Sequence, residues 1–237
     1  MRAYRFVNEL GIAADAAGRA VATAADVTDS HEGGLVEPAP AAARAGAELL
    51  RQLSRAVDGR DHERVTFEAE SVRTAETDGP GFDLGIVVSI DVPTFQGTTA
   101  AMAAVTPADS LFEGVHEEGL DERLAIVPDG SGPSFLLVVG ESNVRAYPAR
   151  SVRSLTEDRT VGAVENHLYG RSLRRFLETL AEGFVGDVPE RPGEAIEAGA
   201  QTLREWAEQN DLDGAVGIRI SATVEQTEST LEAFLED

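Results

Sequence analysis

The feature that most constrains the fold is the apolar run from Phe82 to Val92, which follows a Gly-Pro-Gly turn at residues 79–81. The run is almost continuously apolar and rich in β-branched residues, a pattern typical of a strand that is buried on both faces. Such a strand needs a neighbour along each edge and cover on each side. We therefore expect it to be the central strand of a sheet with helices packed against it.

Hydrophobic periodicity in the rest of the chain predicts the elements around this strand. Apolar residues recur at helical spacing in the segments 41–57, 172–185 and 192–209, and more briefly at 231–235. Alternating or apolar runs predict further strands at 64–72, 98–105, 134–139 and 215–224. The predicted fold class is α/β, with a mixed central sheet flanked by helices. We expect residues 1–40 to be an amino-terminal embellishment and residues 41–237 to form a single α/β domain.

The charge composition is strongly one-sided. The chain has 42 acidic and 20 basic residues, a formal net charge of −22, and every basic residue is Arg. This composition resembles that of proteins from extreme halophiles, whose acidic surfaces stay hydrated in concentrated salt. The resemblance implies a haloarchaeal, salt-adapted protein. A net charge of this sign also argues against broad, nonspecific affinity for nucleic acid, which depends on clustered cations.

Several classes of chemistry are excluded by the residues that the sequence lacks. Without Cys there are no disulfides, thiolate nucleophiles or Cys-ligated metal sites, and without Lys there is no phosphate-binding GxxxxGK[ST] loop. The four His residues are scattered and form no HExxH pair. No apolar run approaches the roughly 20 residues of a membrane helix, and residues 1–10 have no signal-peptide core. We therefore expect a cytoplasmic protein without a membrane partner.

Two carboxylates are the candidate site residues. Asp83 begins the apolar strand, where a carboxylate at the rim of a sheet can bind a hard divalent cation; its alternative role is to cap the turn or strand. Glu48 precedes the inward-facing Leu49 and reaches the same rim if its helix crosses the strand. Alternatively, Glu48 lies on a solvated flank of this helix and has no role in a site. Glu68 and Glu70 share one strand face and either add a carboxylate near Asp83 or coat an exposed face, which we favour.

The stretch GPGFDLGIVVSID at residues 79–91, preceded by a helix and a strand, resembles the metal-binding strand of the PD-(D/E)XK, or restriction-endonuclease-like, nucleases. In looser outline the resemblance extends to SFLLVVGESN at 134–143 and to the helix at 171–187. It implies a restriction-endonuclease-like core (αβββαβ) with amino- and carboxyl-terminal helical additions. Glu48 and Asp83 would then occupy catalytic places, with Asp83 as the metal ligand.

The sequence departs from this family where the chemistry is most demanding. The next strand of the family carries Glu or Gln, any residue, then Lys, whereas this chain reads TTAAMAAVTP at 98–107. That Lys activates the attacking water and offsets phosphate charge. Arg73 and Arg123 are conceivable substitutes by position, but Arg stays protonated and is a poor proton acceptor. We therefore expect an inactive, cofactor-free member of the family that binds or assembles with an unknown protein partner.

Two alternatives remain open. The first is an unorthodox Mg²⁺-dependent nuclease that uses Glu48, Glu70 and Asp83, and the second is a structural or interaction protein unrelated to nucleases. Nucleic acid would bind only through a local patch of Arg residues. The densest basic region comprises Arg145, Arg150, Arg153, Arg159, Arg171, Arg174 and Arg175. The ordinary interpretation of these residues is that they pair with surrounding acids.

Overall fold

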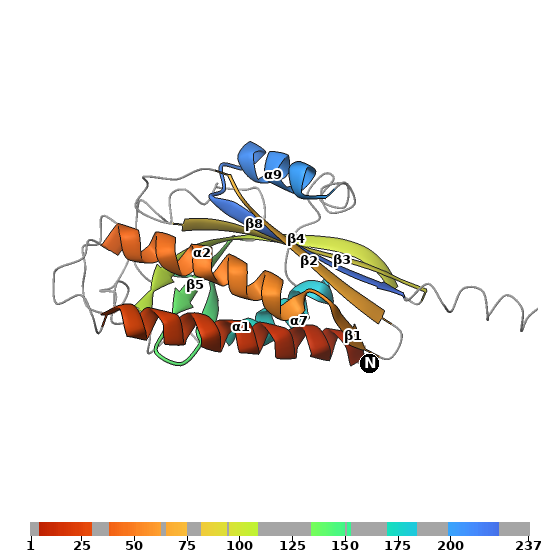
Figure 1. The fold of residues 1–237 in the computed structure, drawn as a ribbon, viewed down its shortest axis with the longest axis horizontal. Helices are drawn as coiled ribbons and strands as arrows, with labels where there is room; N and C mark the ends of the chain where they lie inside the picture. Colours follow the sequence, from red (N-terminus) through yellow and green to blue (C-terminus); the bar gives the residue numbers. More distant parts are fainter. Residues whose placement is uncertain are drawn as a thin grey trace, which may run out of the picture.

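A computed structural model describes residues 5–29, 38–62, 65–74, 82–93, 95–108, 134–149, 151–152, 170–183 and 199–222. These residues form a mixed sheet of eight strands with helices on both faces (Figure 1). The strands are β1 (Arg60–His62), β2 (Val65–Arg73), β3 (Phe82–Val92), β4 (Phe95–Pro107), β5 (Ser134–Val139), β6 (Val144–Pro148), β7 (Arg171–Ser172) and β8 (Gly214–Ala222). The predicted α/β class and mixed sheet are confirmed.

The strand order across the sheet is β1-β2-β8-β3-β4-β5-β6-β7. The pairs β8–β3 and β4–β5 are parallel, and the other five pairs are antiparallel. It follows that β2, β4 and β5 run in one direction, while β3 and β8 run in the opposite direction. The last residues of β2 and β5 therefore meet the first residues of β3 and β8 at one end of the sheet.

β3 is central, as its apolar run predicts. It pairs with β4 over its whole length and with β8 from Leu84 to Asp91, and all residues from Leu84 to Ile90 are buried. The strand that precedes it in the sequence, β2, is not its neighbour, because β8 lies between them. β8 is buried over most of its length, whereas β2 exposes Glu68 and Glu70. The more apolar strand thus takes the inner position.

In the part of the chain that the structure describes, three helices cover one face of the sheet and one helix covers the other (Figure 1). α1 (Arg5–Asp29), α2 (Pro38–Val57) and α7 (Leu173–Ala181) pack on the first face. Leu84, Ile86 and Val88 of β3 point into this main core. On the second face, α9 (Ala200–Gln209) buries Leu203, Trp206 and Ala207 against Val87, Ala100 and Ala215. α2 covers the sheet as the helix predicted at 41–57 should.

The amino-terminal segment contributes more to the core than the sequence suggested. Within the predicted embellishment, α1 inserts Leu10, Ala14 and Val21 into the main core and packs against both α2 and α7. The many Ala residues on its inner side let it lie close to these helices. Residues 1–4 and 30–37 lie outside the described residues.

The carboxyl-terminal elements agree in part with their predicted bounds. α7 ends at Ala181, before the predicted end of the helix at residue 185, because Gly183 already adopts a positive φ of 74°. The predicted helix at 192–209 is described from Ala200 onward, with Leu203, Trp206 and Ala207 buried, and its part before residue 199 lies outside the described residues. The short helix predicted at 231–235 lies outside the described residues. Among the residues that the structure describes, no helix is both long and apolar enough to cross a membrane.

Candidate functional site

A cleft opens where the amino-terminal half of α2 crosses the end of the sheet at which β2 and β5 finish. Its volume is about 600 Å³. The described residues that line it come from α1 (Val21, Ala24), α2 (Ala41, Arg44, Ala45, Ala47, Glu48, Leu50, Arg51), β2 (Ser71, Val72, Arg73) and β5 (Val139). We call this cavity the α2 cleft.

Small residues explain both the close packing of α2 and the space beside it. At Gly46 the helix backbone rests on the buried ring of Phe82, leaving no room for a side chain. Ala41, Ala45 and Ala47 fill little of the volume on either side of this contact. The helix is thus fixed close to the start of β3 at one point and leaves an open, largely apolar wall around it.

The central polar feature of the α2 cleft is an ion pair between Glu48 and Arg51. Nε of Arg51 donates to Oε2 of Glu48 at 2.9 Å, and Nη2 donates to Oε1 at 2.5 Å. Nε2 of Gln52 also donates to Oε1, at 2.7 Å. The hydrogen bond from Arg51 lowers the pKa of Glu48 below its ordinary 4.5, although partial burial opposes the shift. The hydrogen bond to Glu48 likewise raises the pKa of Arg51.

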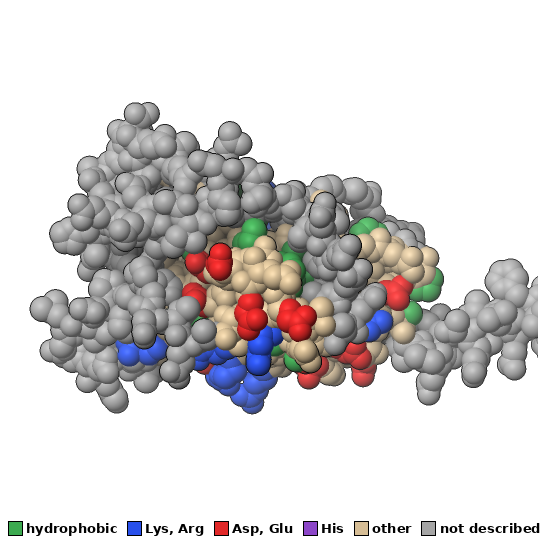
Figure 2. Space-filling model, turned by 90° about the horizontal axis from the view of Figure 1, so that it is seen from above, with side chains coloured by type: hydrophobic (Ala, Val, Ile, Leu, Met, Phe, Trp, Pro, Cys, Tyr) green, Lys and Arg blue, Asp and Glu red, His purple; other side chains and the backbone are tan. Residues whose placement is uncertain are grey.

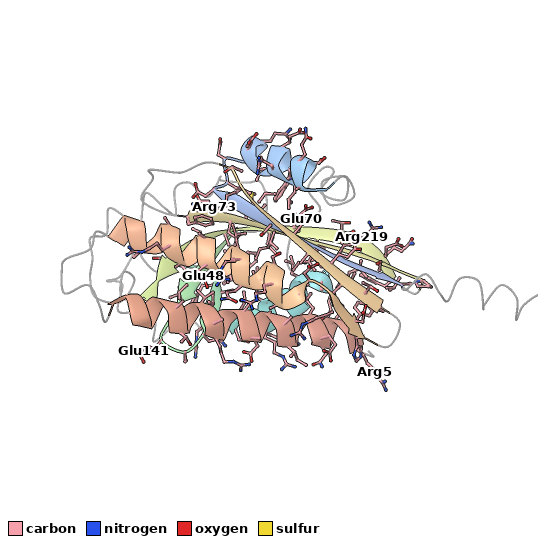
Figure 3. The ribbon with its side chains drawn as sticks, in the orientation of Figure 1. Arg5, Glu48, Glu70, Arg73, Glu141 and Arg219 are labelled. Atoms are coloured by element: carbon pink, nitrogen blue, oxygen red, sulfur yellow. The ribbon has the colours of Figure 1, made fainter. Side chains whose placement is uncertain are left out.

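The described lining of the cleft is positive within a strongly negative chain. It holds three arginines, Arg44, Arg51 and Arg73, and one glutamate, a formal charge of +2 (3 − 1). Arg44 and Arg51 are seven residues apart and so share one flank of α2. Arg73, the last residue of β2, is exposed and has no ion-pair partner among the described residues. Figure 3 shows Glu48 on α2 and Arg73 at the end of the neighbouring strand.

The structure does not bring the two predicted catalytic residues together. Phe82, Leu84 and Ile86 face the main core under α2, so Asp83 points to the opposite face of the sheet. Its partner in β4, Ala104, belongs to the apolar cluster on that second face. Glu48 and Asp83 therefore lie near the same end of the sheet but on opposite faces. Among the described residues, no group of three or more His, Asp or Glu side chains is placed to hold a metal ion.

At the start of β3, the backbone of Asp83 is bound by Asp213. The N–H of Asp83 donates to Oδ2 of Asp213 at 2.7 Å, and the N–H of Asp213 donates to the carbonyl of Asp83 at 2.9 Å. Asp213 precedes β8 and is buried. This reciprocal pair joins the starts of the parallel strands β3 and β8.

Glu68 and Glu70 lie on the α9 face of β2 and are exposed. They alternate with Phe67 and Ala69, which face the main core, and the favoured prediction that they coat a sheet face is confirmed. Figure 3 places Glu70 on the α9 side of the sheet, away from Glu48. The carboxylate cluster required by a Glu48, Glu70 and Asp83 site is thus divided by the sheet.

The predicted Arg patch is partly described. Arg174 and Arg175 both pair with Glu178, at 2.9 and 3.1 Å, which confirms their ordinary interpretation as ion-pair partners. Arg123, Arg150, Arg153 and Arg159 lie outside the described residues. Viewed from the α9 side, Asp and Glu side chains are scattered over the described surface, and the largest group of Arg side chains lies at one edge (Figure 2).

Sequence reasoning identified Glu48 but missed the residues that surround it. The available signal was the spacing of Arg44, Glu48 and Arg51, which places three charges on one helix flank beside small Ala residues. For Arg73, the sequence pattern indicates only a substitute for a catalytic Lys. No family model matches the chain, and no curated protein or solved structure is significantly similar to it.

Proposed function

We propose that the protein is a noncatalytic binding module and that its binding site for an anionic ligand is the α2 cleft. The observation that carries this proposal is the set of three guanidinium groups around an apolar cavity in a chain of net charge −22. Guanidinium groups bind carboxylates and phosphates through paired hydrogen bonds. At low ionic strength, the excess of guanidinium groups in the described lining also attracts anions toward the cleft.

A degenerate restriction-endonuclease-like core remains part of the proposal. The order α2, β1, β2, β3, β4 contains the helix and three strands that the resemblance implies, with the short strand β1 added directly after the helix. α2 also crosses the start of β3. Under this proposal, β8 is an addition to the core sheet, because it lies between β2 and β3.

The absence of phosphodiester cleavage follows from chemistry. Cleavage needs metal-bound nucleophile generation and charge stabilisation in one place. Here Glu48 and Asp83 lie on opposite faces, β4 supplies no carboxylate between Thr98 and Pro107, and the chain has no Lys. Loss of a single preorganised charge-stabilising group typically costs on the order of 10²–10³ in rate.

The first experiment measures DNA cleavage by the full chain with Mg²⁺ or Mn²⁺ in molar KCl, beside an Asp83→Ala variant. We expect equal, background activity in both. Metal-dependent cleavage that disappears in Asp83→Ala would replace this proposal with the Mg²⁺-dependent nuclease alternative.

The second experiment measures binding to the cleft with 1-anilinonaphthalene-8-sulfonate, which joins an apolar body to a sulfonate. We expect saturable binding at one site and an affinity about five- to tenfold lower in Arg73→Gln, which removes a charged hydrogen-bond donor at the surface. The matched control is Arg55→Gln, the same change at an exposed residue of α2 outside the cleft lining. If the probe does not saturate, or if both variants weaken it equally, the α2 cleft is not the binding site.

A further inference from the structure

We propose that Glu48 is a resident anion in the α2 cleft, and that the ligand is an amphipathic anion whose head group displaces Glu48 from Arg51. This inference rests on the proposed binding function and specifies the ligand and the exchange that admits it. The head group is a carboxylate or a phosphate monoester, and the body is an apolar chain.

The geometry of the Glu48–Arg51 ion pair indicates that a ligand head group would replace the Glu48 carboxylate. Both carboxylate oxygens of Glu48 accept from Arg51, one from Nε and one from Nη2. This is the edge of a guanidinium that carboxylates and phosphates use in two-point binding. A ligand head group that binds this edge must therefore take the place of the Glu48 carboxylate.

The surroundings of the ion pair keep the free-energy cost of displacing Glu48 small. The Arg51 side chain is 55% exposed, and exposed ion pairs between residues three or four apart are weak. Gln52 already donates to Glu48 at 2.7 Å and stays available to the displaced carboxylate. Glu48 itself remains in contact with solvent, with 24% of its side chain exposed. The carboxylate thus has an alternative partner and water when a ligand arrives.

The apolar lining of the α2 cleft indicates that the body of the ligand is an apolar chain. Ala41, Ala45, Leu50 and Val139 border the same cavity as the guanidinium groups. In concentrated salt the Debye length falls to about 3 Å, so attraction between exposed charges contributes little at a distance. Burial of a methylene group, by contrast, adds a factor of about four in affinity. A head group alone binds weakly under these conditions, and an apolar chain is needed to hold it.

The test is calorimetric titration of the full chain in molar KCl with octanoate, octyl phosphate, acetate and 1-octanol. We expect octanoate or octyl phosphate to bind at least tenfold more tightly than acetate or 1-octanol. The comparison of the two octyl anions identifies the preferred head group. Equal binding of 1-octanol and the octyl anions, or no binding of either anion, would overturn the ligand assignment.

The decisive variant is Glu48→Gln, which keeps the shape of the side chain and removes the competing charge. We expect it to tighten binding of the preferred octyl anion about two- to fivefold, the value of an exposed ion pair. Arg51→Gln should weaken the same binding. The matched control is Asp15→Asn on α1, which also raises the net charge from −22 to −21 and breaks a helix ion pair, with Arg19, outside the cleft lining.

The outcomes separate this inference from the proposed function. If 1-anilinonaphthalene-8-sulfonate binds in an Arg73-dependent way but Glu48→Gln changes anion affinity no more than Asp15→Asn, only the resident-anion inference fails. If Glu48→Gln weakens binding, Glu48 contacts the ligand favourably and the inference also fails. If neither the sulfonate probe nor the octyl anions bind, the proposed function fails first.

Discussion

Gly46 is the residue that sets the distance between α2 and the sheet. A Cβ at this position would overlap Cγ and Cδ1 of Phe82 and lie 2.6 Å from its Cβ, and Phe82 is fully buried. We expect Gly46→Ala to lower the free energy of unfolding by about 1–3 kcal/mol, the usual cost of overpacking. The higher helix propensity of Ala, worth about 1 kcal/mol, offsets only part of this loss.

Urea unfolding compares Gly46→Ala with a matched control, Gly97→Ala in β4. Among the described residues, a Cβ at Gly97 would meet no atom closer than 3.8 Å, so that variant should retain its stability. A Gly46→Ala protein as stable as the original would show that α2 does not rest on Phe82 as described.

Glu48 provides a pH-dependent observable at the same cleft. Because the hydrogen bond from Arg51 lowers its pKa in the folded protein below 4.5, the ion pair adds stability above that pH. This contribution is lost as the pH falls below 4.5 through the pKa of the folded state. A carbon-13 NMR titration of the Glu48 carboxylate should show a depressed pKa that moves back toward 4.5 in Arg51→Gln. An unchanged titration in that variant would contradict the assigned cause.

Asp83 shows what a residue pattern can and cannot predict. The apolar run correctly placed it at the start of a central strand, at the rim of the sheet. Whether Glu48 lies on the same face of the sheet as Asp83 depends on which alternate residues of β3 face α2. The sequence shows that Asp83 and Leu84 point in opposite directions, but not which face the helix covers. Only the packing of Gly46 on Phe82 decides this, and that contact joins two segments distant in sequence.

At the scale of elements, α1 and α7 meet through a buried carboxylate. Glu178 of α7 pairs with Arg174 and Arg175, and its side chain lies against Gly11 of α1. A Cβ at Gly11 would overlap Oε1 of Glu178 and lie 2.8 Å from its Cγ. Nη2 of Arg174 also donates to Oδ1 of Asn8 on α1, at 2.7 Å. The absence of a side chain at Gly11 therefore allows these helices to approach.

This contact predicts strong coupling between Gly11 and Glu178. We expect Gly11→Ala alone to destabilise the protein by about 1–3 kcal/mol through overpacking. In a Glu178→Ala background the same change should be neutral, or stabilising by up to about 1 kcal/mol, because only the helix propensity remains. A double-mutant cycle from urea unfolding measures the difference. Additive effects of the two changes would mean that Gly11 and Glu178 do not meet.

Helices and strands with a strong period were predictable, whereas their neighbours in space were not. The segments at 41–57, 64–72 and 215–224 correspond to α2, β2 and β8 because periodicity is a local property. The position of β8 between β2 and β3 was not predicted, since it depends on which strands bury more apolar surface together. For the same reason, the Ala-rich pattern of α1 was compatible with a helix but did not reveal its place in the main core.

At the scale of the whole molecule, the net charge of −22 should make stability depend on salt. The Debye length shrinks from about 10 Å at 0.1 M to about 3 Å at 1 M, so added KCl screens the mutual repulsion of the carboxylates. We expect the melting temperature to rise with KCl, by about 2–4 °C for each kcal/mol of stabilisation in a domain of this size.

A charge variant separates screening from the general effect of salt on apolar burial, which also changes stability. Five exposed carboxylates, at Asp61, Glu68, Glu70, Glu205 and Glu208, are replaced by the corresponding amides, which raises the formal net charge from −22 to −17. If repulsion between carboxylates is the main cause of the salt dependence, this variant should have a higher melting temperature than the original in dilute buffer. Its melting temperature should also rise less in molar KCl. Parallel salt curves for the two proteins, measured by calorimetry between 0.1 M and 2 M KCl, would assign the salt effect to apolar burial instead.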